Sequence, residues 1–160
     1  MATLTVSAAD EKRVKGMGFL GNKGTDNFSA RIITINGKVT AEQMRAITDA
    51  AEKYGNGTIL FTTRLTVEVQ GIPYEKIDEF KAAIEAAGMS CGGTGSKVRP
   101  VVSCKGTTCQ YGLIDTFALS EEIHHRFYEG YRQVKLPHKF KIAVGGCPNN
   151  CVKPDLNDLG

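Results

Sequence analysis

Two closely spaced pairs of cysteines constrain this sequence more than any other feature. Four residues separate the cysteines of the first pair and three separate those of the second. The pairs are Cys104 with Cys109, and Cys147 with Cys151. Each pair follows a β-rich run, VVSC or KFKIAV, so a turn after each strand can direct the sulfur atoms to one point. Four thiolates form a complete ligand set for an iron–sulfur cluster, although zinc and Cu(I) also favour soft thiolates.

The residues beside these cysteines favour a cluster. Gly106, Gly145 and Gly146 allow the backbone to approach a bulky inorganic group, and Pro148 directly follows Cys147, as at some cluster ligands. Both spacings are wider than the two-residue loops usual for structural zinc. Zinc and four free buried cysteines stay open as alternatives at this point. Cys91 has no close partner in the sequence, and we expect it to be a structural thiol.

The chain carries no sign of export or membrane insertion. Its first residues, MATLTVSAADEKRVKG, place charges where a signal peptide needs an apolar run, and nowhere do eighteen apolar residues follow one another. An odd number of cysteines without an export signal favours metal ligation over disulfides. The net charge of +3 does not demand a nucleic-acid partner. We therefore expect a cytoplasmic protein that binds neither nucleic acid nor a membrane.

The first half of the chain predicts a small α+β domain. Glycines at 16, 18, 21 and 24 favour an irregular lead-in over residues 1–27. The elements expected after it are a strand at 30–35, a helix between Thr40 as N-cap and Gly55, strands at 58–61 and 65–72, and a helix between Pro73 and Gly88. This order is typical of a ferredoxin-like half-domain, which we place at 28–90.

A second domain is expected at 91–160, after the glycine-rich joint CGGTGSKVRP. It should contain a buried strand at 101–104, an amphipathic helix at about 111–133 and a strand at 139–144. The apolar face of that helix is expected to use Leu113, Phe117, Ile123 and Phe127. His124 and His125 have no ligand partner at an obvious spacing, so both are expected to face solvent.

Basic residues form the second signal. In a strand at 139–144, Lys139 and Lys141 share one face, while Phe140 and Ile142 take the other. Two adjacent ammonium groups repel each other unless an anion lies between them. Taken alone, such a run is more typical of a solvated edge strand. Arg64 and Arg99 precede apolar strands and are uninformative by themselves, and Arg31 can be paired or can extend to solvent.

In combination these segments resemble the sirohaem-dependent sulfite and nitrite reductases, from about Phe28 to Gly160. The segments that carry the resemblance are FSARIITINGKVTAEQM, LFTTRLTVEVQGI, KVRPVVSCKGTTC and LPHKFKIAVGGCPNNC, and the last is the most specific. The resemblance implies a ferredoxin-like half-domain followed by part of an α/β domain that binds sirohaem and a 4Fe-4S cluster. The small, single-copy anaerobic sulfite reductases are the nearest type.

The resemblance also implies roles for individual residues. Cys104, Cys109, Cys147 and Cys151 would hold the 4Fe-4S cluster, and the sulfur of Cys151 would also ligate the sirohaem iron. Arg64, Arg99, Lys139 and Lys141 match positions around the substrate anion. Arg31 matches a contact to the carboxylates of the macrocycle, and Arg64 lies at the cofactor as well. Fixed cations of this kind suit both an oxyanion and a carboxylate-rich cofactor.

The implied activity is a six-electron reduction of sulfite to sulfide or of nitrite to ammonia. The implied electron donor is a ferredoxin or a flavoprotein subunit, and a homo-oligomer is compatible with the sequence. Two features depart from the family: the first cysteine pair has one residue fewer between its members than the familiar spacing, and the chain is expected to be incomplete at its C-terminus. The alternative function is a non-catalytic 4Fe-4S electron carrier or redox sensor, which has no need of an anion site.

Overall fold

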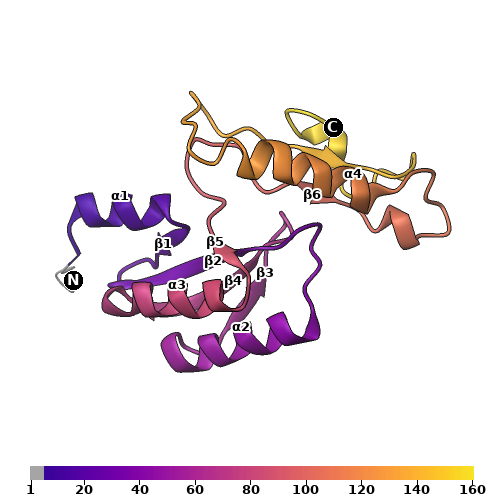
Figure 1. Ribbon diagram of the computed structural model, residues 1–160. Coiled ribbons are helices and arrows are strands. Elements are labelled where there is room, and N and C mark those ends of the chain that lie inside the picture. The colour runs from indigo at the N-terminus through magenta and orange to yellow at the C-terminus, as the bar shows by residue number, and fades with distance from the viewer. Residues whose placement is uncertain (1–5) are drawn as a thin grey trace. The chain divides into compact units, whose positions relative to one another are not determined.

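The computed structural model describes residues 6–160, which form two compact units (Figure 1). The first unit contains residues 6–33 together with Val39–Gly95. The second contains Thr34–Lys38 and Ser96–Gly160. No helix within residues 6–160 combines the length and the apolar character needed to cross a membrane.

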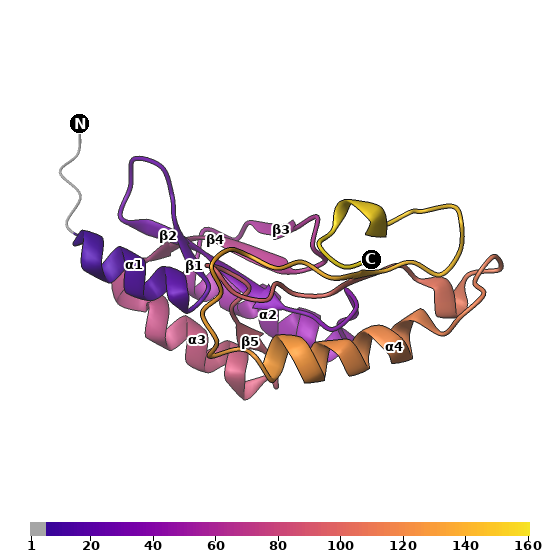
Figure 2. The same cartoon turned by 90° about the horizontal axis from the view of Figure 1, so that it is seen from above.

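The first unit is an antiparallel sheet covered by two helices. Its strands lie in the order β1 (Phe19–Gly21), β2 (Asn27–Ile33), β4 (Val67–Pro73) and β3 (Ile59–Phe61), and β5 (Ser90–Cys91) also pairs with β2. The helices α2 (Ala41–Tyr54) and α3 (Ile77–Ala86) lie side by side on one face of this sheet (Figures 1 and 2). This arrangement confirms the predicted α+β fold class.

Helix α2 begins and ends where its sequence predicts, whereas α3 begins at Ile77 and not at Pro73 as expected. The Thr40 side chain accepts the N–H of Gln43 at 3.1 Å, and the Gln43 side chain accepts the N–H of Thr40 at 2.9 Å. This reciprocal cap satisfies two N–H groups that an α-helix leaves open at its start. A single 3-10 turn, η1 (Tyr74–Lys76), precedes α3, and Gly88 ends that helix with a φ of 72°.

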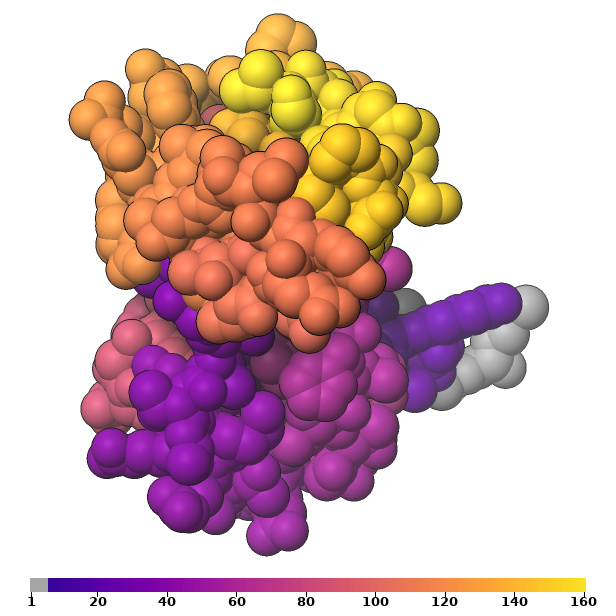
Figure 3. Space-filling view, turned by 90° about the vertical axis from the view of Figure 1, so that its right-hand side faces the viewer, coloured from indigo at the N-terminus to yellow at the C-terminus, as the bar shows by residue number. Residues whose placement is uncertain are grey.

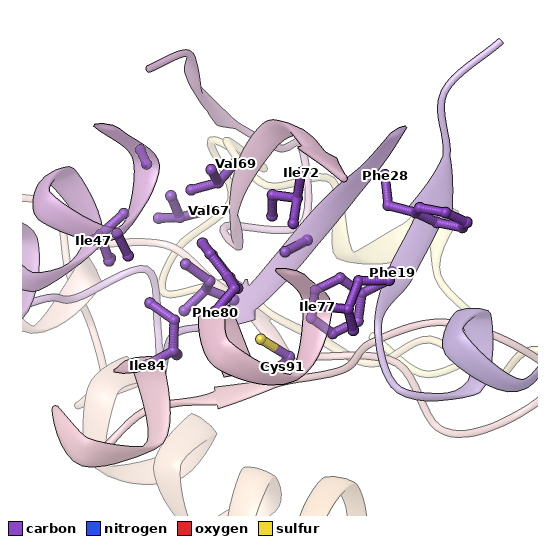
Figure 4. Close-up of a cluster of buried hydrophobic side chains, with 14 of the residues drawn as sticks. Phe19, Phe28, Ile47, Val67, Val69, Ile72, Ile77, Phe80, Ile84 and Cys91 are labelled. Carbon is purple, nitrogen blue, oxygen red and sulfur yellow. The ribbon is translucent and has the colours of Figure 1, made fainter. Parts of the chain in front are cut away.

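The core of this unit forms where the helices meet the sheet (Figure 4). Ile47 of α2 and Phe80 of α3 are fully buried, and the Phe80 ring meets Phe19 edge to face at 6.1 Å between centroids. The close-up shows the sulfur of Cys91 among these apolar side chains, and Cys91 is only 1% exposed. The prediction of a structural thiol at this position is confirmed.

The expectation of an irregular lead-in over residues 1–27 is wrong for much of the described part. Helix α1 (Ala8–Gly16) begins at Ser7, whose hydroxyl accepts the N–H of Asp10, and β1 follows it directly. Val14 of α1 is completely buried in the core. Gly18 does not disrupt these elements; it joins them with a φ of 106°, where a Cβ would lie 2.4 Å from the nitrogen of Gly92. Residues 1–5 of the lead-in lie outside the described range.

The second unit is built on two short parallel strands, β6 (Val102–Ser103) and β7 (Ala143–Val144). Val101, Ile142 and Val144 form its small buried core. The last residues return to this core, since the N–H of Ala143 donates to the carbonyl of Leu159 at 3.0 Å. In the space-filling view the C-terminal segment, in yellow, packs against the rest of this unit (Figure 3). The remaining elements are η2 (Gly106–Thr108), α4 (Thr116–Ile123), η3 (His124–Glu129) and η4 (Pro154–Leu156).

The helix expected at about 111–133 is shorter and changes type. It begins at Thr116, because the Asp115 side chain caps it by accepting the N–H of Ala118 at 3.0 Å. From His124 onward it continues as the π-helix η3, in which the N–H of Gly130 donates to His125 at 3.1 Å. The expected apolar face is wrong: Leu113 is 75% and Phe127 is 42% exposed, whereas the buried face consists of residues four apart, namely Thr116, Ser120, His124 and Tyr128. His124 is therefore buried at 3% exposure, contrary to the prediction, whereas His125 faces solvent as expected.

A turn at residues 34–38 belongs to the second unit through its contacts with α4. Asn36 adopts a φ of 61°, and its side chain donates to the carbonyl of Phe117 at 3.1 Å and accepts from the hydroxyl of Ser120. Lys38 places its ammonium 4.6 Å from the centre of the Phe117 ring. Asn tolerates this left-handed conformation better than residues without a short polar side chain.

Replacing Asn36 with alanine is expected to lower the free energy of unfolding by about 2–3 kcal/mol, because one buried and one partly buried hydrogen bond are lost and alanine is strained at this φ. Urea denaturation would measure the change. The control is Asn36→Gly, which loses the same side chain without the backbone strain and should cost about 1 kcal/mol less. Equal losses in both variants would contradict the role assigned to the φ angle.

Candidate active site

The two cysteine loops leave the same edge of the second unit. Strands β6 and β7 are parallel, so their carboxyl ends are adjacent, and the N–H of Cys104 donates to the carbonyl of Val144 at 3.1 Å. The first loop continues from Cys104 through η2 to Cys109. The second begins at Gly145 and carries Cys147 and Cys151. The expectation that each cysteine pair follows a strand is confirmed.

Backbone contacts join these loops. The N–H of Gly146 is directed at Cys104 Sγ, 3.3 Å away, and the carbonyl of Gly146 accepts the N–H of Leu113 at 3.0 Å. A Cβ added to Gly106 or Gly146 would lie 3.3 Å or 3.4 Å from Cys104 Sγ. Glycine at both positions therefore allows the two loops to close around the Cys104 sulfur.

All four cysteines of the pairs are free thiols. Cys104, Cys109 and Cys147 are partly buried, whereas Cys151 is exposed. Across residues 6–160 no group of three or more His, Cys, Asp or Glu side chains is arranged to hold one metal ion, so the four sulfur atoms are not gathered at a single point. Soft sulfur donors on two adjoining glycine-rich loops, with an N–H directed at one sulfur, are nevertheless a set that fits a 4Fe-4S cluster.

The start of α4 fastens the first cysteine loop, a feature that sequence reasoning missed. The Thr116 hydroxyl donates to the carbonyl of Cys104 at 2.9 Å, and the Thr107 hydroxyl donates to Asp115 at 2.6 Å. Hydrogen bonds from the Ala118 N–H and from Thr107 lower the pKa of the Asp115 carboxyl. An Asp directly before a run of helix-forming residues is an N-cap signal, so the sequence did contain a clue to this contact.

Three of the predicted anion-binding cations lie on neighbouring segments of the second unit. The N–H of Arg99 donates to the carbonyl of Phe140 at 2.8 Å, which places Arg99 beside the segment that carries Lys139 and Lys141. Lys139 is exposed and Lys141 is partly exposed, and neither ammonium forms an ion pair within the described part of the chain. Regular strand structure begins only at Ala143 and not at Lys139 as predicted, and Phe140 is 38% exposed whereas Ile142 is buried.

The other two predicted cations belong to the first unit. Arg31 forms an ion pair with Glu68 on the neighbouring strand, with Nη2 and Oε2 3.0 Å apart, and Nη1 donates to Gly93 at 3.4 Å. Of the two possibilities considered from the sequence, Arg31 is therefore paired and does not extend freely to solvent. Arg64 lies in the turn between β3 and β4, where the N–H of Leu65 donates to Thr62 at 3.0 Å. The strand expected from Leu65 begins two residues later, at Val67, because Leu65 has a φ of 58°.

One carboxylate serves both histidines of η3. Glu129 lies 2.6 Å from Nδ1 of His125 and 3.6 Å from Nε2 of His124. The hydrogen bond to Glu129 raises the pKa of His125 from its ordinary value of 6.5. Burial lowers the pKa of His124, and Glu129 only partly offsets this effect. The ring of His124 also packs on Tyr128, with 4.8 Å between centroids.

These shifts predict opposite contributions to stability as pH changes. The ion pair of His125 stabilises the fold below pH 6.5 and is lost as pH rises through its raised pKa. His124 stays neutral in the fold, so stability falls as pH drops below 6.5, where the unfolded chain takes up the proton. NMR titration of the imidazole signals should therefore show His124 protonating at a lower pH than His125. Glu129→Gln should lower the pKa of His125, and the reverse order of titration would contradict this assignment.

Comparison with known protein families identifies the family to which this chain belongs. Residues 21–87 match the nitrite/sulfite reductase ferredoxin-like half domain, and residues 94–160 match the nitrite and sulphite reductase 4Fe-4S domain. The chain belongs to the nitrite and sulfite reductase family. The family resemblance inferred from the sequence is therefore confirmed. The second unit, which contains both cysteine pairs, corresponds to the family's 4Fe-4S domain.

Named relatives in this reductase family include two sulfite reductases. The chain is 33% identical over 145 residues to the coenzyme F420-dependent sulfite reductase of Methanocaldococcus jannaschii, covering 89% of this chain and 23% of the relative. It is 32% identical over 158 residues to a subunit of the anaerobic sulfite reductase of Salmonella typhimurium, covering 86% of this chain and 43% of the relative. The chain thus spans less than half the length of either one.

Among solved structures, the Mycobacterium tuberculosis NirA protein has the same fold. The superposition covers 96% of this reductase-family chain and 32% of the NirA chain, with a TM-score of 0.79 and 19% sequence identity. At this identity the likeness concerns the fold alone. It supports the ferredoxin-like and α/β assignment of the two units.

Proposed function

We propose that this chain serves in the reduction of sulfite, with nitrite as the alternative oxyanion. The observation that carries the proposal is the meeting of the two cysteine loops at one strand edge, with the Gly146 N–H 3.3 Å from Cys104 Sγ. Cys104, Cys109, Cys147 and Cys151 would hold a 4Fe-4S cluster, and Cys151 would couple it to sirohaem. The two relatives described above are named sulfite reductases, and others of similar identity are named nitrite reductases, so both oxyanions are to be assayed.

When bound, the cluster would supply single electrons and sirohaem the iron centre for the six-electron reduction. The chain's own cations bind and orient the oxyanion. Arg99 offers paired N–H donors that match two oxygens, and the ammonium groups of Lys139 and Lys141 bind the anion and donate protons to departing oxygen. Arg64 is proposed as a fourth cation at the anion and the cofactor.

Arg31 is proposed to contact the carboxylates of sirohaem. It already donates a hydrogen bond to the carboxylate of Glu68, so the guanidinium binds a carboxylate in this environment. The Arg31 side chain is still 22% exposed in this ion pair, which leaves part of it open to a further carboxylate.

The remaining assignments concern organisation and partners. We place a ferredoxin-like half-domain at 28–90 and the cofactor-binding domain at 91–160. Four free thiols favour the reducing cytoplasm as the compartment. A ferredoxin or a flavoprotein subunit is the proposed electron donor. The Salmonella relative is named as one subunit of its reductase, which favours a donor on a separate subunit.

The test is anaerobic purification of the chain from cells that produce sirohaem, followed by a visible spectrum with iron and acid-labile sulfide analysis. A chlorin-like band in the red together with four cluster irons supports the reductase and leads to assays with sulfite and nitrite. Cluster absorption without a macrocycle would replace the reductase with the electron carrier or redox sensor. A colourless protein containing zinc would overturn both.

A further inference from the structure

We propose that Thr116 is the positioning residue that holds the two cysteine loops at one spacing. It is the first residue of α4 and is completely buried, although it is neither a cysteine nor a charged residue. The inference rests on the proposed function only in naming a 4Fe-4S cluster as the group that the loops bind. Its contacts with the loops involve both the hydroxyl and the methyl group.

The hydroxyl of Thr116 fixes the first loop. Its oxygen donates to the carbonyl of Cys104 at 2.9 Å and accepts the N–H of Thr107 at 3.2 Å. A hydroxyl can donate one hydrogen bond and accept another, so this single group links the backbone of Cys104 to that of Thr107 in η2. The Thr116 carbonyl is itself held by the hydroxyl of Ser120 at 2.6 Å, which fixes the backbone from which the side chain extends.

The methyl of Thr116 lies where the two loops meet. A Cβ on Gly106 would be 2.7 Å from Thr116 Cγ2, and a Cβ on Gly146 would be 2.9 Å from the same atom. Neither glycine has a positive φ, so close approach to this methyl, and not backbone conformation, excludes a side chain at both positions. One side chain therefore sets the distance between Cys104 and the turn that leads into Cys147.

The first experiment separates the hydroxyl from the methyl in the whole chain before cluster is added. Thr116→Val keeps the shape and loses the hydroxyl, so hydrogen exchange at the Thr107 amide should accelerate about three- to tenfold, the effect of one hydrogen bond. Thr116→Ser keeps the hydroxyl and should retain the protection. The matched control is Thr48→Val, the same substitution in α2 of the first unit, where the hydroxyl donates to the carbonyl of Met44 at 2.9 Å and contacts neither loop. Equal acceleration in Thr116→Val and Thr48→Val would overturn the proposal.

The second experiment tests the methyl and stays informative if Thr116→Val does not fold. In Gly146→Ala the reconstituted cluster should be lost to a chelator at least about tenfold faster, because the new methyl forces the loops apart. Adding Thr116→Ser removes Cγ2 and should restore most of the cluster's lifetime. A double variant as labile as Gly146→Ala alone would refute the role of the methyl. If the wild-type chain takes up no 4Fe-4S cluster, the proposed function fails, whereas the exchange experiment still decides the role of Thr116.

Discussion

Replacing Cys104 with serine is expected to abolish retention of a 4Fe-4S cluster by this chain. The Cys104 sulfur lies where the two loops meet and receives the N–H of Gly146, so no neighbouring cysteine can take its place without rearranging both loops. A serine hydroxyl is a hard donor with a high pKa, and iron–sulfur clusters favour thiolates. Iron and acid-labile sulfide per chain should fall close to the level of the chain before reconstitution.

The matched control is Cys91→Ala. Cys91 is also a free thiol, but it is 1% exposed in the core of the first unit. Its replacement should keep the full iron content and lower the free energy of unfolding by about 1 kcal/mol, because only a small buried group is removed. Full iron content in Cys104→Ser, or loss of iron in Cys91→Ala, would contradict the assignment of the cluster ligands.

The sequence predicts those parts of the fold in which local signals and burial agree. Helix α2 has a reciprocal cap at Thr40 and apolar residues at helical spacing, and both signals lie within one short segment of the sequence. Helix α1 was missed because its pattern is weakly amphipathic, with Val14 as its only buried residue, and because the glycines around it were interpreted as breaking structure. In fact Gly18 is required by the close approach of the Gly92 backbone, a contact between segments more than seventy residues apart.

The candidate site divides in the same way. The cysteine pairs can be recognised from their spacing and the strands before them from the β-rich runs VVSC and KFKIAV, and the family match supports a 4Fe-4S domain at these residues. The pairing of Arg31 with Glu68 depends on strand register, which leaves no local signature. His124 was missed because the buried face of α4 begins with the polar residues Thr116 and Ser120, which a search for apolar periodicity does not select. Thr116 was missed because its importance comes from Gly106 and Gly146, which adjoin it only in the folded chain.

Replacing Lys139 with glutamine is expected to lower kcat/KM for sulfite by about 10²-fold, and Lys141→Gln should have a similar effect. Neither ammonium forms an ion pair within residues 6–160, so each charge is available to an anion, and Arg99 lies on the adjoining segment. Removing a fixed cation weakens binding of the oxyanion and also removes a proton donor. The loss should therefore appear in both kcat and KM in steady-state assays of the reconstituted chain with a chemical reductant.

Lys135→Gln is the matched control, since Lys135 is an exposed lysine of the same KLPHKFK segment and its loss changes the net charge by the same amount. If long-range attraction of sulfite were the whole effect, all three variants would lose activity equally and salt would remove the difference. A site-specific role requires that Lys139→Gln and Lys141→Gln stay impaired at high ionic strength while Lys135→Gln matches the wild type. Lys139→Arg adds a further distinction, because it should recover the KM for sulfite but not the full kcat: a guanidinium retains the charge and cannot donate its proton at neutral pH.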